Sequence, residues 1–281
     1  MRIITLNCWG GRINLPLIEW LEHADADVYC LQEVFDSPHT EFYSDEKGSH
    51  RADPSDAKKP PVKGNLFDQI KEILPNHRGY MLPACKWELT DVANAENLPC
   101  YFGIATFVRK DIPVHEVKTT FVHQAFRAVP QVEAPTPRVA FAMRFFNPAT
   151  NRQVVVAHMH GLWIPEGKHY TTTRMLQAQA FSRLIDSVSY PGDQVVVCGD
   201  FNVLPGDPTF ELLQKNCGVK DLIADRFDGT RTRLYFDIPS KKGQPLYADY
   251  LLVSKEVKVK KVDVLYAPVV SDHCPLVLDF E

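Results

Sequence analysis

The chain has 281 residues, 45% of them hydrophobic and 23% charged, and its formal net charge is −4. This composition is typical of a globular protein with a sizeable core, and the charge excludes the broadly basic surface that binds long nucleic acids. No apolar run approaches the about 20 residues that a membrane-spanning helix needs, so we expect no integral membrane segment. The length fits one large α/β domain or two small ones.

Seven cysteines are spread along the chain without a C-x-x-C pair: Cys8, Cys30, Cys85, Cys100, Cys198, Cys217 and Cys274. Their number is odd and several lie in apolar runs, which predicts buried free thiols rather than disulfides or a cysteine zinc site. Such thiols suit a reducing compartment, so we expect a cytoplasmic protein. A signal peptide removed from the mature chain stays an alternative.

The first two predicted strands each end on a polar side chain. Arg2 to Leu6 is an apolar strand that leads to Asn7. Val28 to Leu31 is another apolar strand, and it leads to Glu33. Between them, Asn14 caps a predicted helix with proline in its first turn. The order strand, helix, strand predicts parallel neighbours, whose ends meet at the edge of a sheet where ligands bind.

Residues 36–64 contain several prolines and charged residues but few aliphatic side chains. This composition predicts a long surface excursion, and a structureless loop of such length is usually functional or disordered. The next predicted elements are a helix over 65–74 and strands over 102–109, 139–145 and 153–157. Further along we expect helices over 171–188 and 208–214, and strands over 248–253, 257–265 and 276–280.

The strongest local signal is the apolar strand Val195 to Cys198, which ends at Gly199 and is followed by Asp200 and Asn202. In an extended segment, side chains at i and i+2 point the same way. A carboxylate and an amide side by side at the end of a buried strand indicate a functional site. The alternative is a solvated turn with an Asx cap.

Other predicted strand ends also carry polar side chains. They are His158 after the strand over 153–157, Asp249 in the strand over 248–253, and Asp272 with His273 before the strand over 276–280. Each residue alone has an ordinary explanation as a turn, edge or half-exposed residue. Chance placement at so many strand ends is improbable, so the set predicts one site.

Carboxylates and amides without a cysteine cluster offer the hard oxygen ligands that Mg²⁺ and Mn²⁺ prefer. Phosphate transfer needs such a cation, a group that aligns water, and donors for the developing charge. A histidine beside a carboxylate supplies a base or a charge-assisted donor. The residue types therefore point to metal-assisted phosphate chemistry.

In order and spacing, these residues resemble the endonuclease/exonuclease/phosphatase superfamily, which includes DNase I, exonuclease III-type nucleases, inositol polyphosphate 5-phosphatases, neutral sphingomyelinases and deadenylases. The matching motifs are Asn7, Leu31-Gln32-Glu33, His158, Gly199-Asp200-Phe201-Asn202, Asp249 and Ser271-Asp272-His273. The resemblance covers nearly the whole chain. It implies a single catalytic domain over residues 1–281 with an α/β fold of four layers, in which two mixed β-sheets pack face to face with helices outside.

The resemblance also implies a role for each matching residue. Glu33 would be the main ligand of Mg²⁺ or Mn²⁺, with help from Asn7 and Asp272. Asp200 would align or deprotonate the attacking water, and Asn202 would hold the phosphate.

His273, oriented by Asp249, would bind the phosphate and stabilise the transition state. We expect the Asp249 carboxylate to raise the pKa of this imidazole. His158 matches the histidine of the family's Thr-His-Leu motif, although alanine replaces the threonine. Arg174 and Gln177 match a helix pattern common in the family and are expected to be structural.

The implied function is a metal-dependent phosphodiesterase, nuclease-like, in which activated water attacks in line. Trp9 stands where exonuclease III-like enzymes carry an acidic residue, which argues against abasic-site cleavage. Alternatives are sphingomyelinase-like or phosphatase activity on a small phosphorylated substrate, and a catalytically inactive binding module. A zinc hydrolase built on His158 and His160 is a further alternative, but the Asp-His that should follow this pair is missing.

We expect a monomer that acts on a short nucleic acid or on a small phosphorylated molecule. With a net charge of −4, any contact with nucleic acid must be local. The candidate contacts are Arg231, Arg233, Lys241, Lys242 and the pair Lys58-Lys59.

Overall fold

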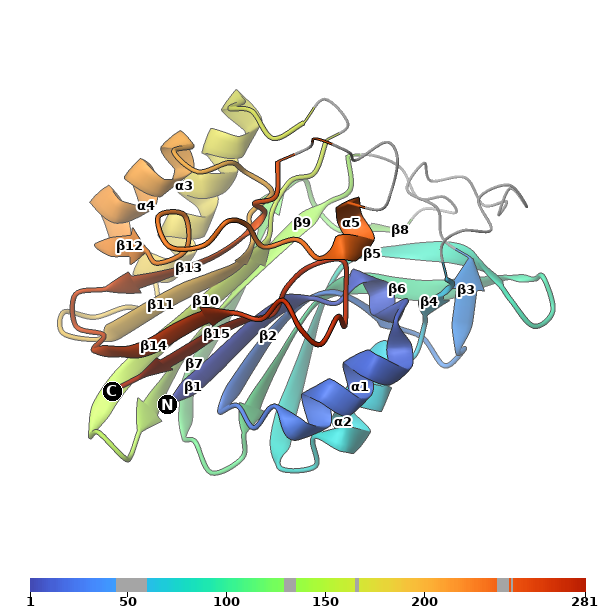
Figure 1. Cartoon of the computed structure of the whole chain (residues 1–281), viewed down its shortest axis with the longest axis horizontal. Coiled ribbons are helices and arrows are strands. Elements are labelled where there is room, and N and C mark those ends of the chain that lie inside the picture. The colour runs from blue at the N-terminus through green and yellow to red at the C-terminus, as the bar shows by residue number, and fades with distance from the viewer. Residues whose placement is uncertain (44–59, 129–134, 165–166, 237–242, 244) are drawn as a thin grey trace.

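The computed structural model describes residues 1–43, 60–128, 135–164, 167–236, 243 and 245–281. Two β-sheets pack face to face, with helices on both outer sides (Figure 1). This is the four-layer α/β sandwich that the sequence motifs imply, and the expected fold class is confirmed.

The larger sheet has nine strands among the described residues, in the order β14-β15-β1-β2-β6-β5-β3-β4, with β8 paired to β5. Its strands are β1 (Arg2–Asn7), β2 (Val28–Asp36), β3 (Glu41–Tyr43), β4 (Val62–Lys63), β5 (His77–Asp91), β6 (Asn97–Arg109), β8 (Arg127–Ala128), β14 (Val259–Val264) and β15 (Leu276–Phe280). As predicted, β1 and β2 are parallel, and Asn7 pairs with Gln32.

The smaller sheet has six strands among the described residues, in the order β12-β13-β11-β10-β9-β7. Its strands are β7 (Val114–His123), β9 (Arg138–Asn147), β10 (Arg152–His160), β11 (Gln194–Asp200), β12 (Val219–Asp221) and β13 (Asp249–Ser254). Strands β10 and β11 are parallel, and their register places His160 level with Asp200. Strand β13 is antiparallel to β11 and places Asp249 opposite Asp200.

The helices cover the outer faces of the two sheets. Helices α1 (Asn14–His23) and α2 (Leu66–Ile73) lie on one side, and α3 (Thr172–Asp186) and α4 (Pro208–Cys217) lie on the other (Figure 1). The one-turn α5 (Arg233–Phe236) and the 3-10 helix η1 (Trp9–Gly11) lie in connections. The largest apolar cluster fills the space between the sheets and continues under α3 through Phe181 and Leu184. A second cluster joins α1 and α2 to the larger sheet.

The structure extends the expected elements in two ways that matter for the site. Strand β10 runs through His158 to His160 instead of ending at Ala157, so both imidazoles belong to the strand. Strands β5 and β7 were not expected, because neither has a clear alternating apolar pattern. Parts of the predicted excursion, 41–43 and 62–63, are the paired strands β3 and β4, while 44–59 lie outside the described residues.

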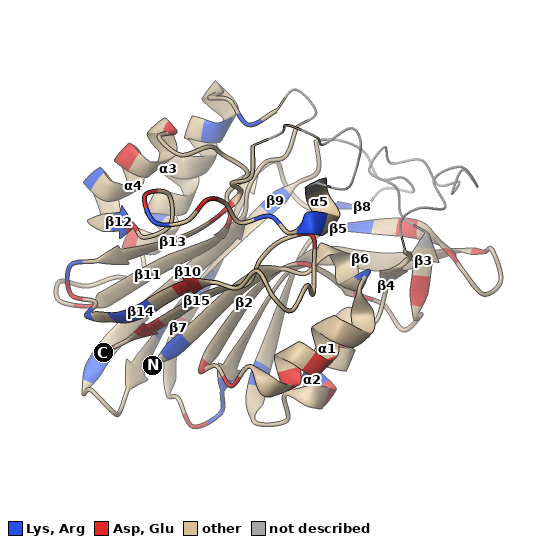
Figure 2. Cartoon of the chain, viewed as in Figure 1, with Lys and Arg blue, Asp and Glu red and all other residues tan. Residues whose placement is uncertain are grey.

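All seven cysteines are free, as expected, and six of them are buried. Within the described part of the chain, no helix is both long enough and apolar enough to cross a membrane. Lys and Arg are interspersed with Asp and Glu over the elements seen in Figure 2, which fits the small net charge.

Candidate active site

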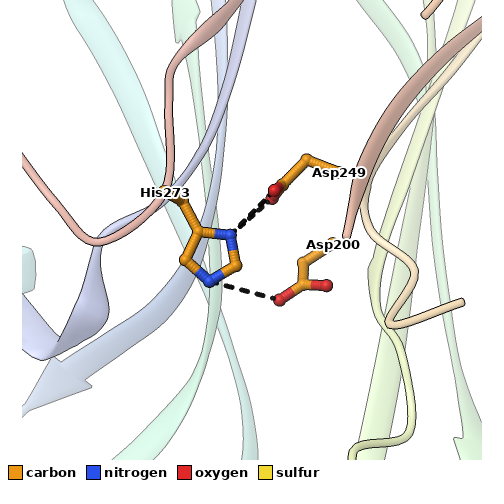
Figure 3. A group of neighbouring side chains, drawn as sticks. All are labelled: Asp200, Asp249 and His273. Atoms are coloured by element: carbon orange, nitrogen blue, oxygen red, sulfur yellow. Dashed lines mark hydrogen bonds and ion pairs between the residues drawn. The ribbon is translucent and has the colours of Figure 1, made fainter. Parts of the chain in front are cut away.

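A histidine and two aspartates form the centre of the site (Figure 3). His273 Nδ1 lies 2.9 Å and 2.8 Å from the two carboxylate oxygens of Asp249. Its other ring nitrogen, Nε2, lies 3.7 Å from Asp200 Oδ2. Because a carboxylate accepts, Nδ1 carries the hydrogen and Nε2 faces Asp200. The structure thus places the Asp249 carboxylate against the His273 ring.

Asp249 is held from a second side by Thr230. The Thr230 hydroxyl donates to Asp249 Oδ2 at 2.8 Å, and its oxygen accepts from the backbone N–H groups of Ala248 and Asp249, each at 3.1 Å. His273 is fixed by its backbone, which donates to the Ser271 hydroxyl at 3.2 Å. The pair is therefore positioned by its local backbone.

Glu33 reaches the site because of a β-bulge. The register of β2 on β6 shifts between Gln32 and Val34, and Glu33 between them has a φ of +54°. In a regular strand Glu33 would point to the opposite face from Gln32, toward the outer helices. The bulge instead brings its carboxylate to Asn7, whose Nδ2 donates to Glu33 Oε1 at 3.0 Å.

Asn7 joins the acids from both sheets. Its Nδ2 also donates to Asp200 Oδ2 at 3.0 Å, while its Oδ1 accepts from the Trp9 N–H at 2.9 Å. The amide therefore presents a donor to Glu33 and Asp200 in this arrangement. This differs from the oxygen ligand that the resemblance implies for Asn7.

The turn after β11 holds Asn202 beside Asp200. The Asn202 N–H donates to Asp200 Oδ1 at 3.0 Å, and its side-chain Nδ2 donates to the Gly161 carbonyl at 3.3 Å. Asn202 has a φ of +53°, a conformation that asparagine tolerates better than most residues. Its buried Oδ1 has no hydrogen-bond partner among the described residues.

Asp272 lies on the other side of His273 and has a partner that the sequence analysis did not assign. Arg231 Nη1 donates to Asp272 Oδ2 at 3.0 Å, and both side chains are buried. Asp272 Oδ1 lies 3.8 Å from His273 Nε2. Arg231, which we named as a candidate contact for nucleic acid, is therefore buried beside the acids of the site. Lys58-Lys59 and Lys241-Lys242 lie outside the described residues.

The structure does not bring His158 into this group. Its Nε2 lies 2.7 Å from the Thr106 hydroxyl and its Nδ1 lies 3.3 Å from Gln32 Nε2, deep between the sheets. Burial lowers the pKa of His158 to about 3. Both ring nitrogens are engaged within the core, and the register explains why: His158 is level with Cys198, one pleat before Asp200.

His160 occupies the position at the carboxylates instead. Its Nε2 lies 3.7 Å from Glu33 Oε1 and 3.8 Å from Asp200 Oδ2. Arg138 Nη1 lies 3.1 Å from its Nδ1. A guanidinium can only donate, so Nδ1 accepts and Nε2 carries the hydrogen that points toward the acids. Burial, together with the charge of Arg138, lowers the pKa of His160 well below its usual value.

Burial raises the pKa of the carboxyl groups in this site. It raises the pKa of Glu33 to about 7, with further increases from Asp272 and Asp200 that oppose the Asn7 hydrogen bond. It raises the pKa of Asp249 to about 6, against the charge of Arg231. Several acids packed at low solvent exposure repel one another, and such a cluster favours a bound cation.

Our expectation that the His273 pKa is raised is wrong. Burial and the charge of Arg231 lower the pKa of His273 to about 3, outweighing the nearby acids. At neutral pH the ring is therefore neutral and Asp249 is ionised. His273 Nε2 then carries a lone pair and can accept a proton.

Glu33, Asp200 and Asp272 offer oxygen donors from three different segments, and the charges of Asp272 and Asp200 add to the effect of burial in raising the pKa of Glu33. Ligand atoms of Asp200, Asp249 and His273 also lie within 4.8 Å of one another. These residues fit a divalent cation. The arrangement combines acids, a proton acceptor and a buried imidazole donor in one place.

The sequence analysis missed His160, Arg138, Thr230, Arg231 and Lys168 as members or neighbours of the site. The sequence did contain a signal for His160. If the strand continues for two residues beyond His158, His160 becomes its last residue. Arg174 and Gln177 are structural as expected: Arg174 donates to the carbonyls of Leu162, Gly167 and His169, and Gln177 accepts from the Leu162 N–H.

Comparison with known proteins identifies similar proteins by sequence and by structure. The 2',5'-phosphodiesterase 12 of Bos taurus is 27% identical over 108 residues, which are 36% of this chain and 18% of that protein. The human protein of that name gives the same identity and coverage. The chain thus spans only a small part of the length of these relatives.

Solved structures match over the full length. The mannosyl-6-phosphatase of Bacteroides thetaiotaomicron has a TM-score of 0.66 at 16% identity, covering 100% of this chain and 99% of that one. The human Nocturnin catalytic domain with bound sulfate has a TM-score of 0.62 at 18% identity, covering 100% and 93%. These likenesses show the fold. A model of the Endonuclease/Exonuclease/phosphatase family matches residues 4–273, and the chain therefore belongs to that family.

Proposed function

We propose that the chain is a divalent-cation-dependent phosphodiesterase that cleaves its substrate by in-line attack of an activated water. One observation carries the proposal: Asp200 Oδ2 accepts from Asn7 and lies 3.7–3.8 Å from the Nε2 atoms of His273 and His160. An acid between a proton acceptor and a proton donor is the arrangement that hydrolysis requires.

Glu33 and Asp272 are the proposed cation ligands, because their oxygens belong to the crowded acidic cluster. When bound, Mg²⁺ or Mn²⁺ would neutralise charge on the phosphate oxygens. Asn7 orients Glu33 and Asp200 by donating to both. This changes its role from the ligand expected at first to a positioning residue.

Asp200 and His273 act on water in the proposed reaction. Water bound by Asp200 transfers a proton to His273 Nε2, and the Asp249 carboxylate stabilises the imidazolium that forms. His160 donates from Nε2 to the developing charge on a phosphate or leaving-group oxygen. Asn202 retains one amide hydrogen for a phosphate oxygen, since the other is used by Gly161.

The substrate is proposed to be a short nucleic acid or a small phosphorylated molecule. The name of the 2',5'-phosphodiesterase 12 relatives supports a nucleotide diester, and the small net charge of −4 supports a short partner. Hydrolysis of a phosphomonoester is the alternative activity that the same site would support.

Metal removal tests the proposal directly. We expect EDTA to abolish hydrolysis, and Mg²⁺ or Mn²⁺ to restore it, because the ligands are oxygens. The assay uses a panel of single-stranded and duplex DNA, RNA, 2',5'-linked oligonucleotides, sphingomyelin and sugar phosphates. Full activity in EDTA, or no activity on any phosphoester, would contradict the assignment.

Glu33→Gln tests the cation site through stability. The Glu33 pKa is raised from an ordinary 4.5 to about 7, so its ionisation costs folding free energy as pH rises through this range. In EDTA at pH 8, the free energy of unfolding of E33Q should exceed that of wild type by about 1–3 kcal/mol. At pH 5 this difference should disappear. Urea denaturation measures this, with the exposed Glu88→Gln as the control. Mg²⁺ should stabilise wild type more than E33Q. If the free energy of unfolding of wild type and of E33Q depends on pH in the same way, the proposed role of Glu33 in the cation site is wrong.

Substitution of the two histidines of β10, His158 and His160, should affect kcat and the melting temperature differently. His160→Gln should lower kcat by about 10²-fold or more, because a proton donor is lost near Asp200. His158→Gln should lower the melting temperature while kcat stays within a few-fold of wild type. Steady-state kinetics and thermal melting distinguish them. A folded H158Q protein as inactive as H160Q would place His158 in the chemistry.

His273 and Asp249 should behave as a unit. His273→Ala should lower kcat by about 10²–10³-fold, and Asp249→Asn should lower it too, because the acid holds the proton acceptor and stabilises its charged form. The double variant should be scarcely worse than H273A. The exposed Asp225→Asn serves as the control. Losses that simply multiply in the double variant would show that the residues act separately.

A further inference from the structure

Arg231 is a buried guanidinium with donor capacity that Asp272 does not use. The side chain is 7% exposed, donates from Nη1 to Asp272, and packs 4.5 Å from the centre of the Tyr235 ring. Its Nε has no hydrogen-bond partner among the described residues. A buried N–H of a charged group without an acceptor is costly.

A second cation lies on the neighbouring loop. Lys168 follows β10 in the segment that leads to α3, and its Nζ donates to the Tyr247 carbonyl. An ammonium has three hydrogens, so further donors remain for another acceptor. Arg174 fixes this segment by donating to the Gly167 carbonyl at 2.8 Å. The Tyr247 carbonyl therefore holds the Lys168 side chain, and Arg174 holds the adjacent backbone.

The two cations are anchored to the same short backbone ladder. Thr230, next to Arg231, donates its N–H to the Leu246 carbonyl at 2.8 Å, and Tyr247 is the next residue. This ladder leads directly to Asp249. The charge of Arg231, after burial, is the largest influence that lowers the pKa of Lys168, to about 7. The cations therefore repel each other at the rim of the acidic site.

We propose that Arg231 and Lys168 form an anion subsite beside the acidic cluster, which binds phosphate oxygens of the substrate. An anion between them would accept from the unpartnered Arg231 Nε and from the remaining hydrogens of the Lys168 ammonium, and it would relieve the repulsion between the two cations. The acids hold the cation on one side, and this pair holds phosphate on the other. The inference rests on the proposed function and adds an affinity for anionic phosphate that the acids alone would oppose. The oxygens belong to the reacting phosphate or to a second phosphate beside it.

Binding of inorganic phosphate to the full chain in EDTA tests the subsite without catalysis. Calorimetry at low salt and pH 7 should detect binding to wild type, and Lys168→Met should weaken it by about tenfold. Lys168→Arg should restore most of the affinity, and the exposed Lys220→Met should change nothing. Arg231→Lys, checked for folding by its melting temperature, should also weaken binding. No binding to wild type, or equal affinity in K168M and K220M, overturns the subsite.

Kinetics locate the oxygens that the subsite binds. With a substrate that has one phosphate, a raised KM in K168M supports contact with the reacting phosphate. A rise seen only with a second adjacent phosphate supports contact with that group. An unchanged KM for both substrates overturns the proposal. If no phosphoester is hydrolysed at all, the proposed function fails while the phosphate-binding measurement still decides the subsite.

Discussion

The parallel register of β10 on β11 is the constraint on which the site depends. It sets His160 level with Asp200, and the antiparallel β13 then sets Asp249 opposite the same residue. Side chains alternate along a strand, so a slip of one residue would turn the imidazole of His160 away from the acids. The apolar core between the sheets specifies this register, because each strand must bury its inward face. Catalytic geometry is thus a consequence of core packing.

Acids from both sheets gather at one place, and the electrostatic cost of this cluster is partly offset by the rest of the site. Burial raises the pKa of Glu33 and of Asp249, and at Glu33 the charges of Asp272 and Asp200 raise it further. Arg138 and Arg231 approach the acids from strand β9 and from the segment before α5, and they compensate part of the charge. Compensation by fixed cations remains incomplete at Glu33. A divalent cation at this point would therefore stabilise the fold as well as serve the chemistry.

Sequence reasoning predicted the fold class and the strand ends, because both follow from short apolar runs that stop at polar residues. It located Asn7, Glu33, Asp200 and Asp249 at strand ends for that reason, and the structure brings these residues together from both sheets. It did not distinguish His158 from His160, since strand length decides which imidazole reaches the edge. It named Arg231 only as a candidate contact for nucleic acid and did not pair it with Asp272, because the β-bridge from Arg231 to His273 joins residues far apart in the sequence. Contacts of this kind leave no local pattern.

The family model and the sequence relatives cover different lengths of this chain. The family model spans residues 4–273, whereas identity to the 2',5'-phosphodiesterase 12 relatives is confined to 108 residues. Strands of the sandwich carry Asn7, His160, Asp200 and Asp249 at their ends. Arg231 and Lys168 lie in connections outside the strands, where sequence varies most freely. In the subsite that we propose, this cation pair is the part of the site where a preference for an anionic group would arise.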